Sequence, residues 1–304
     1  MADCTGFDDL QLLLQSIGSV LLGKRGQVEL ATCCLLAKGH LLIEDMPGTG
    51  KSTLAEALAR GVGLSFKRVS FTSDLLPADL TGLNVFDQRM VDFHFQPGPL
   101  FTQVLLADEI NRASPRTQSA LLEAMAVARV SVDGTTHALP QPFFVIATQN
   151  SLDQVGTSPL PEAQLDRFAM RLSLGYPDRE AERQLLVDAA RPLDQVQPVV
   201  TAQQLQQLQL QAAGLHCSDG LIDYVLDLIQ ASRRSGPGLS SRAAKGLVAV
   251  AKAMALLHGR DYVTVDDVQT VFPAVAEHRL DAGCPSGAGC PLSTALLESV
   301  DALR

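Results

Sequence analysis

Short apolar runs alternate with segments of helical spacing between residues 40 and 175. The apolar runs have the length and composition of buried strands. They are residues 41–44, 66–71, 104–107, 143–148 and 171–174. Segments such as 53–60 and 115–128 between them have helical patterns, and Ser114 and Pro115 supply an N-cap and a first-turn proline for the second. Alternation of this kind is typical of parallel βαβ units, so the pattern predicts a doubly wound α/β sheet.

Two stretches depart from this alternation and predict β-hairpins that protrude from the sheet. Within residues 84–95, apolar and polar side chains alternate from Val91 to Phe95, which is the period of a half-buried strand. In the second stretch, Asp133 and Gly134 lie between two short β-prone runs and form a strong two-residue turn signal. The pattern alone leaves open whether these hairpins are surface decoration or carry a function.

Strand signals fade after residue 176, and helical spacing dominates the rest of the chain. The predicted helices are residues 201–213, 221–233, 242–258 and a segment that begins at 265. Their apolar positions recur at the spacing of an amphipathic helix. We therefore predict two domains, an α/β domain over 1–176 and a helical domain over 177–304.

The composition fits a globular protein with a sizeable core, since 46% of the 304 residues are hydrophobic and 19% are charged. Acidic residues outnumber basic ones by 33 to 24, and the net charge of −9 gives no electrostatic reason to bind duplex nucleic acid. The apolar stretches fall well short of the roughly 20 residues of a membrane-spanning helix. The N-terminus has no apolar signal core. We expect a cytoplasmic protein with protein or small-molecule partners.

The six cysteines are spread over a chain that is large enough to fold without disulfides, so reduced thiols are expected. Cys284 and Cys290 lie in a Gly/Pro-rich stretch, and a loop clip or half a metal site stays open for them. The six histidines lack metal-ligand spacing.

A phosphate-binding (Walker A) loop follows the first predicted strand and precedes a helix. It comprises Asp45, Met46, Pro47, Gly48, Thr49, Gly50, Lys51, Ser52 and Thr53. Glycines let backbone N–H groups turn toward the phosphates, a lysine contacts the β- and γ-phosphates, and a serine hydroxyl binds Mg²⁺. Asp45 stands where a glycine is usual, and we expect it to adopt a left-handed backbone with its carboxylate directed away from phosphate. The alternative is a Gly-rich turn that only links strand to helix.

Polar residues at the ends of two later strands complete a site for phosphoryl transfer to water. Asp108 and Glu109 end the third predicted strand, where Asp108 can hold Mg²⁺ and Glu109 can orient and deprotonate the attacking water. Asn150 follows the fourth strand and can hold that water near the γ-phosphate, although a turn-forming role would also explain an asparagine there. No guanine-specific Asn-Lys-x-Asp motif occurs, so we expect ATP or ADP with Mg²⁺.

With these residues in place, the sequence resembles the MoxR family of AAA+ ATPases over nearly its whole length. The most distinctive matches are residues 97–101, 108–113, 118–125, 147–150, 160–168 and 259–264. The resemblance implies a P-loop AAA+ core with strand order 5-1-4-3-2 and a C-terminal helical lid. It also implies that the two hairpins are inserts, in helix 2 and before sensor 1, of the kind that line a pore or contact clients in related rings.

The same resemblance assigns further residues. Arg167 matches the arginine finger that reaches a neighbour's ATP, although a structural pair with Asp166 would also explain it. Arg242 matches the lid arginine known as sensor 2, with Ser241 where proline is usual. Leu22 and Gly23 match the adenine side of the site. Arg112 and Arg171 are lesser candidates for the subunit interface.

The family implies a hexameric ring that hydrolyses ATP to remodel or mature protein complexes. Its members are associated with protein clients and with von Willebrand factor A domain partners. This chain lacks the Asp-x-Ser-x-Ser motif of those domains, so such a partner would be a separate polypeptide. Two alternatives stay open from the sequence, a DNA-associated motor and a nucleotide-dependent assembly scaffold with little turnover.

Overall fold

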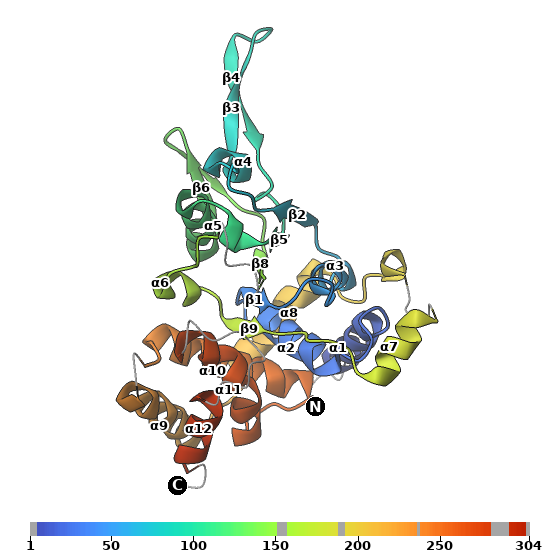
Figure 1. The fold of residues 1–304 in the computed structure, drawn as a ribbon, viewed down its shortest axis with the longest axis vertical. Coiled ribbons are helices and arrows are strands. Elements are labelled where there is room, and N and C mark those ends of the chain that lie inside the picture. Colours follow the sequence, from blue (N-terminus) through green and yellow to red (C-terminus); the bar gives the residue numbers. More distant parts are fainter. Residues whose placement is uncertain (1–4, 151–156, 188–191, 236–237, 281–291, 302–304) are drawn as a thin grey trace.

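The computed structural model describes residues 5–150, 157–187, 192–235, 238–280 and 292–301. A five-stranded parallel sheet lies at its centre (Figure 1), in the order β2-β5-β8-β1-β9. Its strands are β1 (Leu41–Glu44), β2 (Phe66–Ser70), β5 (Val104–Asp108), β8 (Phe144–Gln149) and β9 (Met170–Leu172). This is the predicted order 5-1-4-3-2, read from the opposite edge. All five predicted strands are present.

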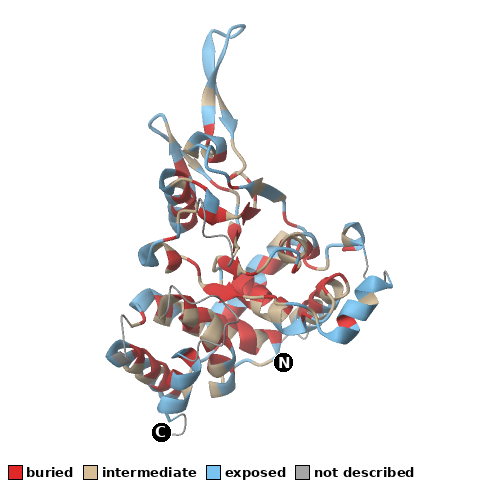
Figure 2. Cartoon of the chain, in the orientation of Figure 1, coloured by how far each residue is buried: buried red, intermediate tan, exposed pale blue. Residues whose placement is uncertain are grey.

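The pleat of the strands sends alternate side chains into two separate hydrophobic clusters, one on each face of the sheet. Leu41 and Ile43 of β1 join the cluster on the face covered by α1, α2 and α3, whereas Leu42 joins the cluster that contains α5. The helices of this half are α1 (Thr5–Gly18), α2 (Arg25–Leu36), α3 (Lys51–Gly61), α4 (Pro77–Thr81), α5 (Pro115–Val127) and α6 (Glu162–Leu165), with a 3₁₀ turn η1 (Ile110–Arg112). Burial on both faces explains why the inner strands β1, β5 and β8 are largely apolar, whereas the edge strand β2 is more exposed and carries Lys67 and Arg68 (Figure 2).

Both predicted hairpins are confirmed. The larger one pairs β3 (Gly82–Asp87) with β4 (Asp92–Pro97) and projects far from the sheet at the top of Figure 1. The smaller one pairs β6 (Arg129–Val132) with β7 (Thr135–Ala138). Its turn residues Asp133 and Gly134 both have positive φ, 49° and 80°, as the two-residue hairpin turn requires.

The rest of the chain is helical, as predicted. Its elements are α7 (Arg179–Leu186), η2 (Leu193–Gln195), α8 (Ala202–Gly214), α9 (Asp219–Ser235), α10 (Ser241–Leu257), α11 (Val265–Leu280) and α12 (Leu292–Ser299). Helix α10 packs against α2 and α8, and α11 packs against β9. One hydrophobic cluster therefore runs from the sheet into the lid helices. The division into 1–176 and 177–304 stays a prediction.

Three of the cysteines lie within the described residues, and all three are free thiols. Cys33 and Cys34 are buried in α2, and burial raises the pKa of both thiols. Cys284 and Cys290 lie outside the described residues, so the structure does not bear on the clip or metal site considered for them. In the described part of the chain, no helix combines the length and apolar character needed to cross a membrane.

Candidate active site

The phosphate loop joins the end of β1 to the first residue of α3. Gly48 and Gly50 have φ of 83° and 94°, a region that side chains rarely tolerate, and Gly50 is the N-cap of α3. The Lys51 ammonium donates to the carbonyls of Asp45 and Met46 at 2.7 and 2.9 Å. A helix N-terminus beside a lysine that lies over the loop is an arrangement suited to an anion.

The Lys51 ammonium also interacts electrostatically with the acidic residues at the end of β5. Burial lowers the pKa of Lys51, while the charges of Asp45, Asp108 and Glu109 act in the opposite direction. Since β1 and β5 both pair in parallel with β8, the loop that follows β1 and the end of β5 lie at the same edge of the sheet. Oxygen atoms from Ser52 and Asp108 are the ligand type that Mg²⁺ prefers, so the residues present fit a magnesium ion at this edge of the sheet.

Asp45 is placed differently from the expectation. It has no positive φ, so the predicted left-handed backbone is wrong. Its carboxylate instead accepts from the backbone N–H groups of Met46, Leu174 and Gly175 at 2.8, 2.7 and 2.6 Å. The bonds from Leu174 and Gly175 tie the start of the loop to the segment after β9, and this explains an acidic residue where a glycine is usual.

Glu109 has an unusual backbone. Its φ and ψ are 57° and 50°, a left-handed conformation that costs free energy in a residue other than glycine and that clusters at functional sites. The conformation turns the chain sharply from β5 into η1. The Glu109 carboxylate is exposed enough to reach a ligand and pairs with Arg112 at 2.9 Å.

Thr148 of β8 positions both acidic residues, a role that sequence reasoning missed. Its hydroxyl donates to Asp108 Oδ1 at 2.6 Å and accepts from the Glu109 N–H at 2.9 Å. The side chain is completely buried. A threonine in an otherwise apolar strand beside β5 was the available signal. Asn150 follows β8 directly, at the same edge of the sheet and half-buried, where the hypothesis of a water-holding role requires it.

Arg68 is a second residue that the sequence did not single out. It comes from β2, which pairs with β5, and its guanidinium binds Asp108 Oδ2 through Nη2 and through Nε, the latter at 3.1 Å. The pairing places a further cation beside the carboxylate expected to hold Mg²⁺. Only the register of β2 against β5 brings the two together.

The sequence matches the family described as "ATPase family associated with various cellular activities (AAA)" over residues 40–170 and the AAA lid domain over residues 231–295. It is 39% identical to "Chaperone MoxR1" of Mycobacterium tuberculosis over 283 residues, a match that covers 89% of this chain and 75% of that protein. The chain belongs to the MoxR family of AAA+ ATPases.

Further comparisons agree with this membership. The chain is 43% identical over 282 residues to "Uncharacterized protein YeaC" of Bacillus subtilis, covering 90% of this chain and 88% of the relative. The crystal structure of a Cytophaga hutchinsonii protein superposes with a TM-score of 0.86 at 32% identity, covering 98% of this chain and 96% of that one. The resemblance drawn from the motifs is thus confirmed for family and fold.

In this MoxR-family chain, the two arginines expected to act on nucleotide lie outside the phosphate loop's own network. Arg167 follows α6 and donates to the Leu122 carbonyl of α5 at 3.0 Å. Arg242, near the start of α10, is largely exposed and lies 3.9 Å from Asp166. Within the described residues, no hydrogen bond or ion pair joins either arginine to the phosphate loop. Their roles at a nucleotide stay predictions.

The predicted adenine side borders the loop. A Cβ on Gly50 would lie 2.9 Å from the Leu21 side chain, and a Cβ on Gly23 would lie 2.7 Å from Ala181 of α7. Leu22 lies between Leu21 and Gly23 in the chain. Lys24, which follows, is buried and donates to the Tyr176 carbonyl at 2.5 Å. The segment therefore packs between the phosphate loop and α7, a position suited to a base.

Of the two lesser interface candidates, Arg171 is excluded. Its side chain is only 4% exposed and pairs with Glu44 at 3.0 Å, so it has no surface to offer a neighbour. The alternation of β9 sends Arg171 inward, which the motif comparison did not reveal. Arg112 is 44% exposed and stays a candidate.

Proposed function

We propose that this protein is a Mg²⁺-dependent ATPase that converts ATP and water into ADP and phosphate. The observation that carries the proposal is the convergence of Lys51, Asp108, Glu109 and Asn150 on one edge of the sheet. Backbone N–H groups at the start of α3 and the Lys51 ammonium bind the phosphates. Glu109 takes a proton from the water that Asn150 orients. Ser52 and Asp108 would hold Mg²⁺, which would supply positive charge beside the phosphates.

We further propose that the protein works as a ring, most simply a hexamer, in which Arg167 completes the neighbouring subunit's site. Support comes from the position of Arg167, which bonds to α5 and not to its own phosphate loop. A guanidinium supplied by a neighbour can stabilise the charge of the transferring phosphoryl group. Sites of this kind are active only in the assembled ring.

The test is turnover per subunit as a function of protein concentration, with saturating Mg²⁺ and ATP. We expect specific activity to rise with concentration over the range in which light scattering shows assembly, and to vanish when EDTA removes Mg²⁺. Activity that is independent of concentration and assembly would contradict the ring. Activity retained in EDTA would contradict the metal requirement.

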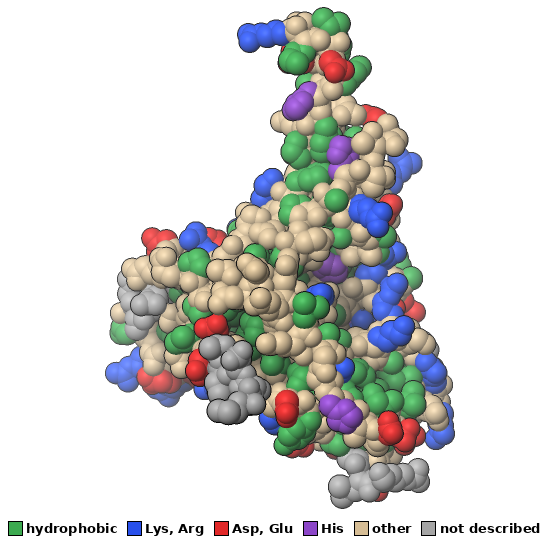
Figure 3. Space-filling view, turned by 180° about the vertical axis from the view of Figure 1, so that it is seen from behind, with side chains coloured by type: hydrophobic (Ala, Val, Ile, Leu, Met, Phe, Trp, Pro, Cys, Tyr) green, Lys and Arg blue, Asp and Glu red, His purple; other side chains and the backbone are tan. Residues whose placement is uncertain are grey.

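We propose that the ring remodels or matures other protein complexes in the cytoplasm, together with a von Willebrand factor A domain partner on a separate polypeptide. Support comes from the similarity to a protein named a chaperone and from the β3–β4 hairpin. Hydrophobic side chains gather on this projection (Figure 3). The exposed ones are Leu83, Val85, Phe86, Met90, Val91 and Phe93. Apolar side chains held away from the body of a protein are typical of a protein-binding surface.

Alanine at Phe86 and Met90 together should weaken binding of an unfolded polypeptide without changing basal ATP hydrolysis. The two side chains are 48% and 75% exposed, and the packing lost with Phe86 is its edge contact with Phe93 inside the hairpin. Fluorescein-labelled casein is the probe, with fluorescence anisotropy as the readout. Alanine at Leu210, 66% exposed on α8, is the matched control. Equal casein affinity in the hairpin variant and in this control would refute the proposed contact.

A further inference from the structure

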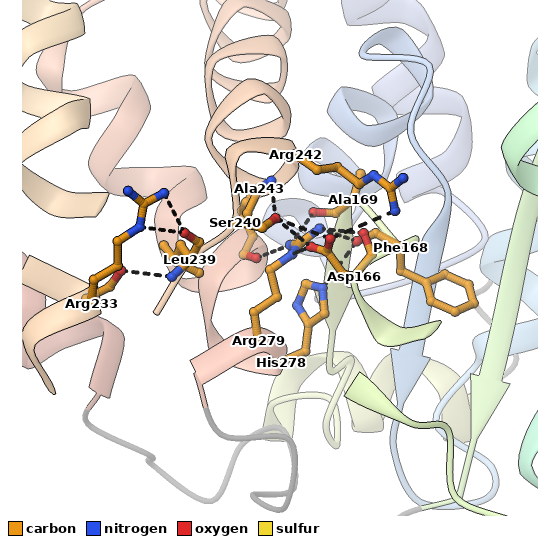
Figure 4. Close-up of polar contacts among 12 residues, drawn as sticks. Asp166, Phe168, Ala169, Arg233, Leu239, Ser240, Arg242, Ala243, His278 and Arg279 are labelled. Carbon is orange, nitrogen blue, oxygen red and sulfur yellow. Dashed lines mark hydrogen bonds and ion pairs between the residues drawn. The ribbon is translucent and has the colours of Figure 1, made fainter. Parts of the chain in front are cut away.

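The segment 166–169 connects α6 to β9 and carries Arg167. Lid residues from two helices converge on it (Figure 4). They come from the end of α11 and from the residues that begin α10. The segment is therefore bound to the lid of its own subunit, although it belongs in sequence to the α/β part of the chain.

Arg279 of α11 makes most of these contacts. Its Nε binds Asp166 Oδ1 at 2.7 Å, and its Nη2 donates to the carbonyls of Phe168 and Asp166 at 2.6 and 3.3 Å. Its Nη1 lies 3.3 Å from the Ala169 carbonyl and also donates to Val275. The side chain is 6% exposed. A buried guanidinium is stable only while its N–H groups keep their hydrogen-bond acceptors. These bonds therefore hold segment 166–169 and α11 in one relative orientation.

His278 adds a second contact from α11. Its Nε2 lies 3.2 Å from the Phe168 carbonyl, and the ring is completely buried. Burial lowers the pKa of this imidazole well below its ordinary value, so the ring is neutral near pH 7 and its Nε2–H donates. Phe168 itself is completely buried. The backbone on the C-terminal side of Arg167 therefore has little freedom to move independently of α11.

Asp166 joins this network to the start of α10. Ser240 caps α10 by accepting from the Ala243 N–H at 3.0 Å, and its hydroxyl donates to the Asp166 carboxylate at 3.2 Å. Arg242 lies 3.9 Å from the same carboxylate. One carboxylate thus contacts both lid helices and stands next to Arg167 in the chain.

From this geometry we propose that Asp166 and Arg279 are positioning residues that couple Arg167 to the lid of its own subunit. When Arg167 leaves the Leu122 carbonyl for a neighbour's phosphate, segment 166–169 moves, and α10 and α11 move with it. Arg242 is part of α10 and moves with it. Nucleotide bound at one site therefore changes the position of the lid over the adjacent subunit's site. The inference rests on the proposed ring and on Arg167 acting in trans.

Coupling of this kind makes nucleotide binding cooperative around the ring. The test measures binding of a fluorescent ATP analogue to Glu109→Gln protein, which is expected to bind without turnover. In this background, Asp166→Asn keeps the size of the side chain and removes its charge. We expect the Hill coefficient to fall from above one to about one, with assembly and first-site affinity unchanged. Arg279→Lys, which keeps a charge but cannot form the fork, should give an intermediate value.

The matched control is Asp267→Asn, which removes the charge from a different ion pair, the buried Asp267 with Arg260 at 2.5 Å. That pair has no contact with segment 166–169 in the described residues, so cooperativity should persist. Cooperative binding that survives both Asp166→Asn and Arg279→Lys would overturn the coupling and leave the ring in place. A Glu109→Gln parent that stays monomeric with ATP would overturn the proposed function, and the coupling with it.

Discussion

Replacing Glu109 by glutamine should lower ATP turnover by about 10²–10⁴-fold while ATP still binds. The amide has the size of the carboxylate but cannot accept a proton from water. Binding survives because the phosphate loop is built from other residues, with Lys51 bonded to the carbonyls of Asp45 and Met46. The Glu109 side chain pairs only with Arg112 in the described structure. The substitution therefore removes a half-exposed ion pair that contributes little to the stability of the fold.

Two measurements separate binding from chemistry. Equilibrium binding of a fluorescent ATP analogue gives affinity, and single-turnover hydrolysis of radiolabelled ATP gives the rate of the chemical step. Glu123→Gln, at an exposed position on α5, is the matched control and should behave as the parent. Unchanged hydrolysis in Glu109→Gln would remove this residue as the base. Loss of nucleotide binding would show that the Glu109 carboxylate supports the phosphate loop itself.

The architecture was predictable because both faces of the sheet are covered. Every residue of β5 from Val104 to Asp108 is buried, and a strand buried on both faces is apolar without interruption. Such a run is visible in the sequence without knowledge of its neighbours. The hairpin turn at Asp133 and Gly134 was equally local, since two residues fix its backbone. Local signals therefore sufficed for the elements and their order.

The side chains around the acidic residues were not predictable in this way. Arg68 and Thr148 reach Asp108 from β2 and β8, and these contacts depend on strand register, which no short motif encodes. Arg279 lies more than one hundred positions after Asp166, and only the packing of α11 on β9 joins them. The backbone conformation of Asp45 was predicted wrongly for a related reason. Its carboxylate accepts from N–H groups of the segment after β9, which is distant in the sequence.

Mixing two inactive variants should restore hydrolysis if Arg167 acts across a subunit interface. Arg167→Ala alone should lose about 10³–10⁵-fold in turnover, since the guanidinium would no longer stabilise transition-state charge. Glu109→Gln alone lacks the base. In a mixed ring, an intact Glu109 from one subunit can meet an intact Arg167 from the next. When the two variants are mixed randomly in equal amounts, about one quarter of the interfaces combine an intact Glu109 with an intact Arg167. Steady-state hydrolysis should therefore recover to about one quarter of the parent's rate.

Arg167 is suited to this test because its substitution removes little from the fold. In the described structure its side chain donates to the Leu122 carbonyl at 3.0 Å, a single bond to a neutral group, and Asp166 keeps its contacts with Arg279 and Ser240. Arg116→Ala, at an exposed site on α5, is the matched control and should retain activity alone. Energy transfer between labelled subunits verifies that mixed rings form. Mixed rings without recovered hydrolysis would mean that each site uses only its own subunit's residues. That result would refute the proposed action of Arg167 on a neighbouring subunit's nucleotide.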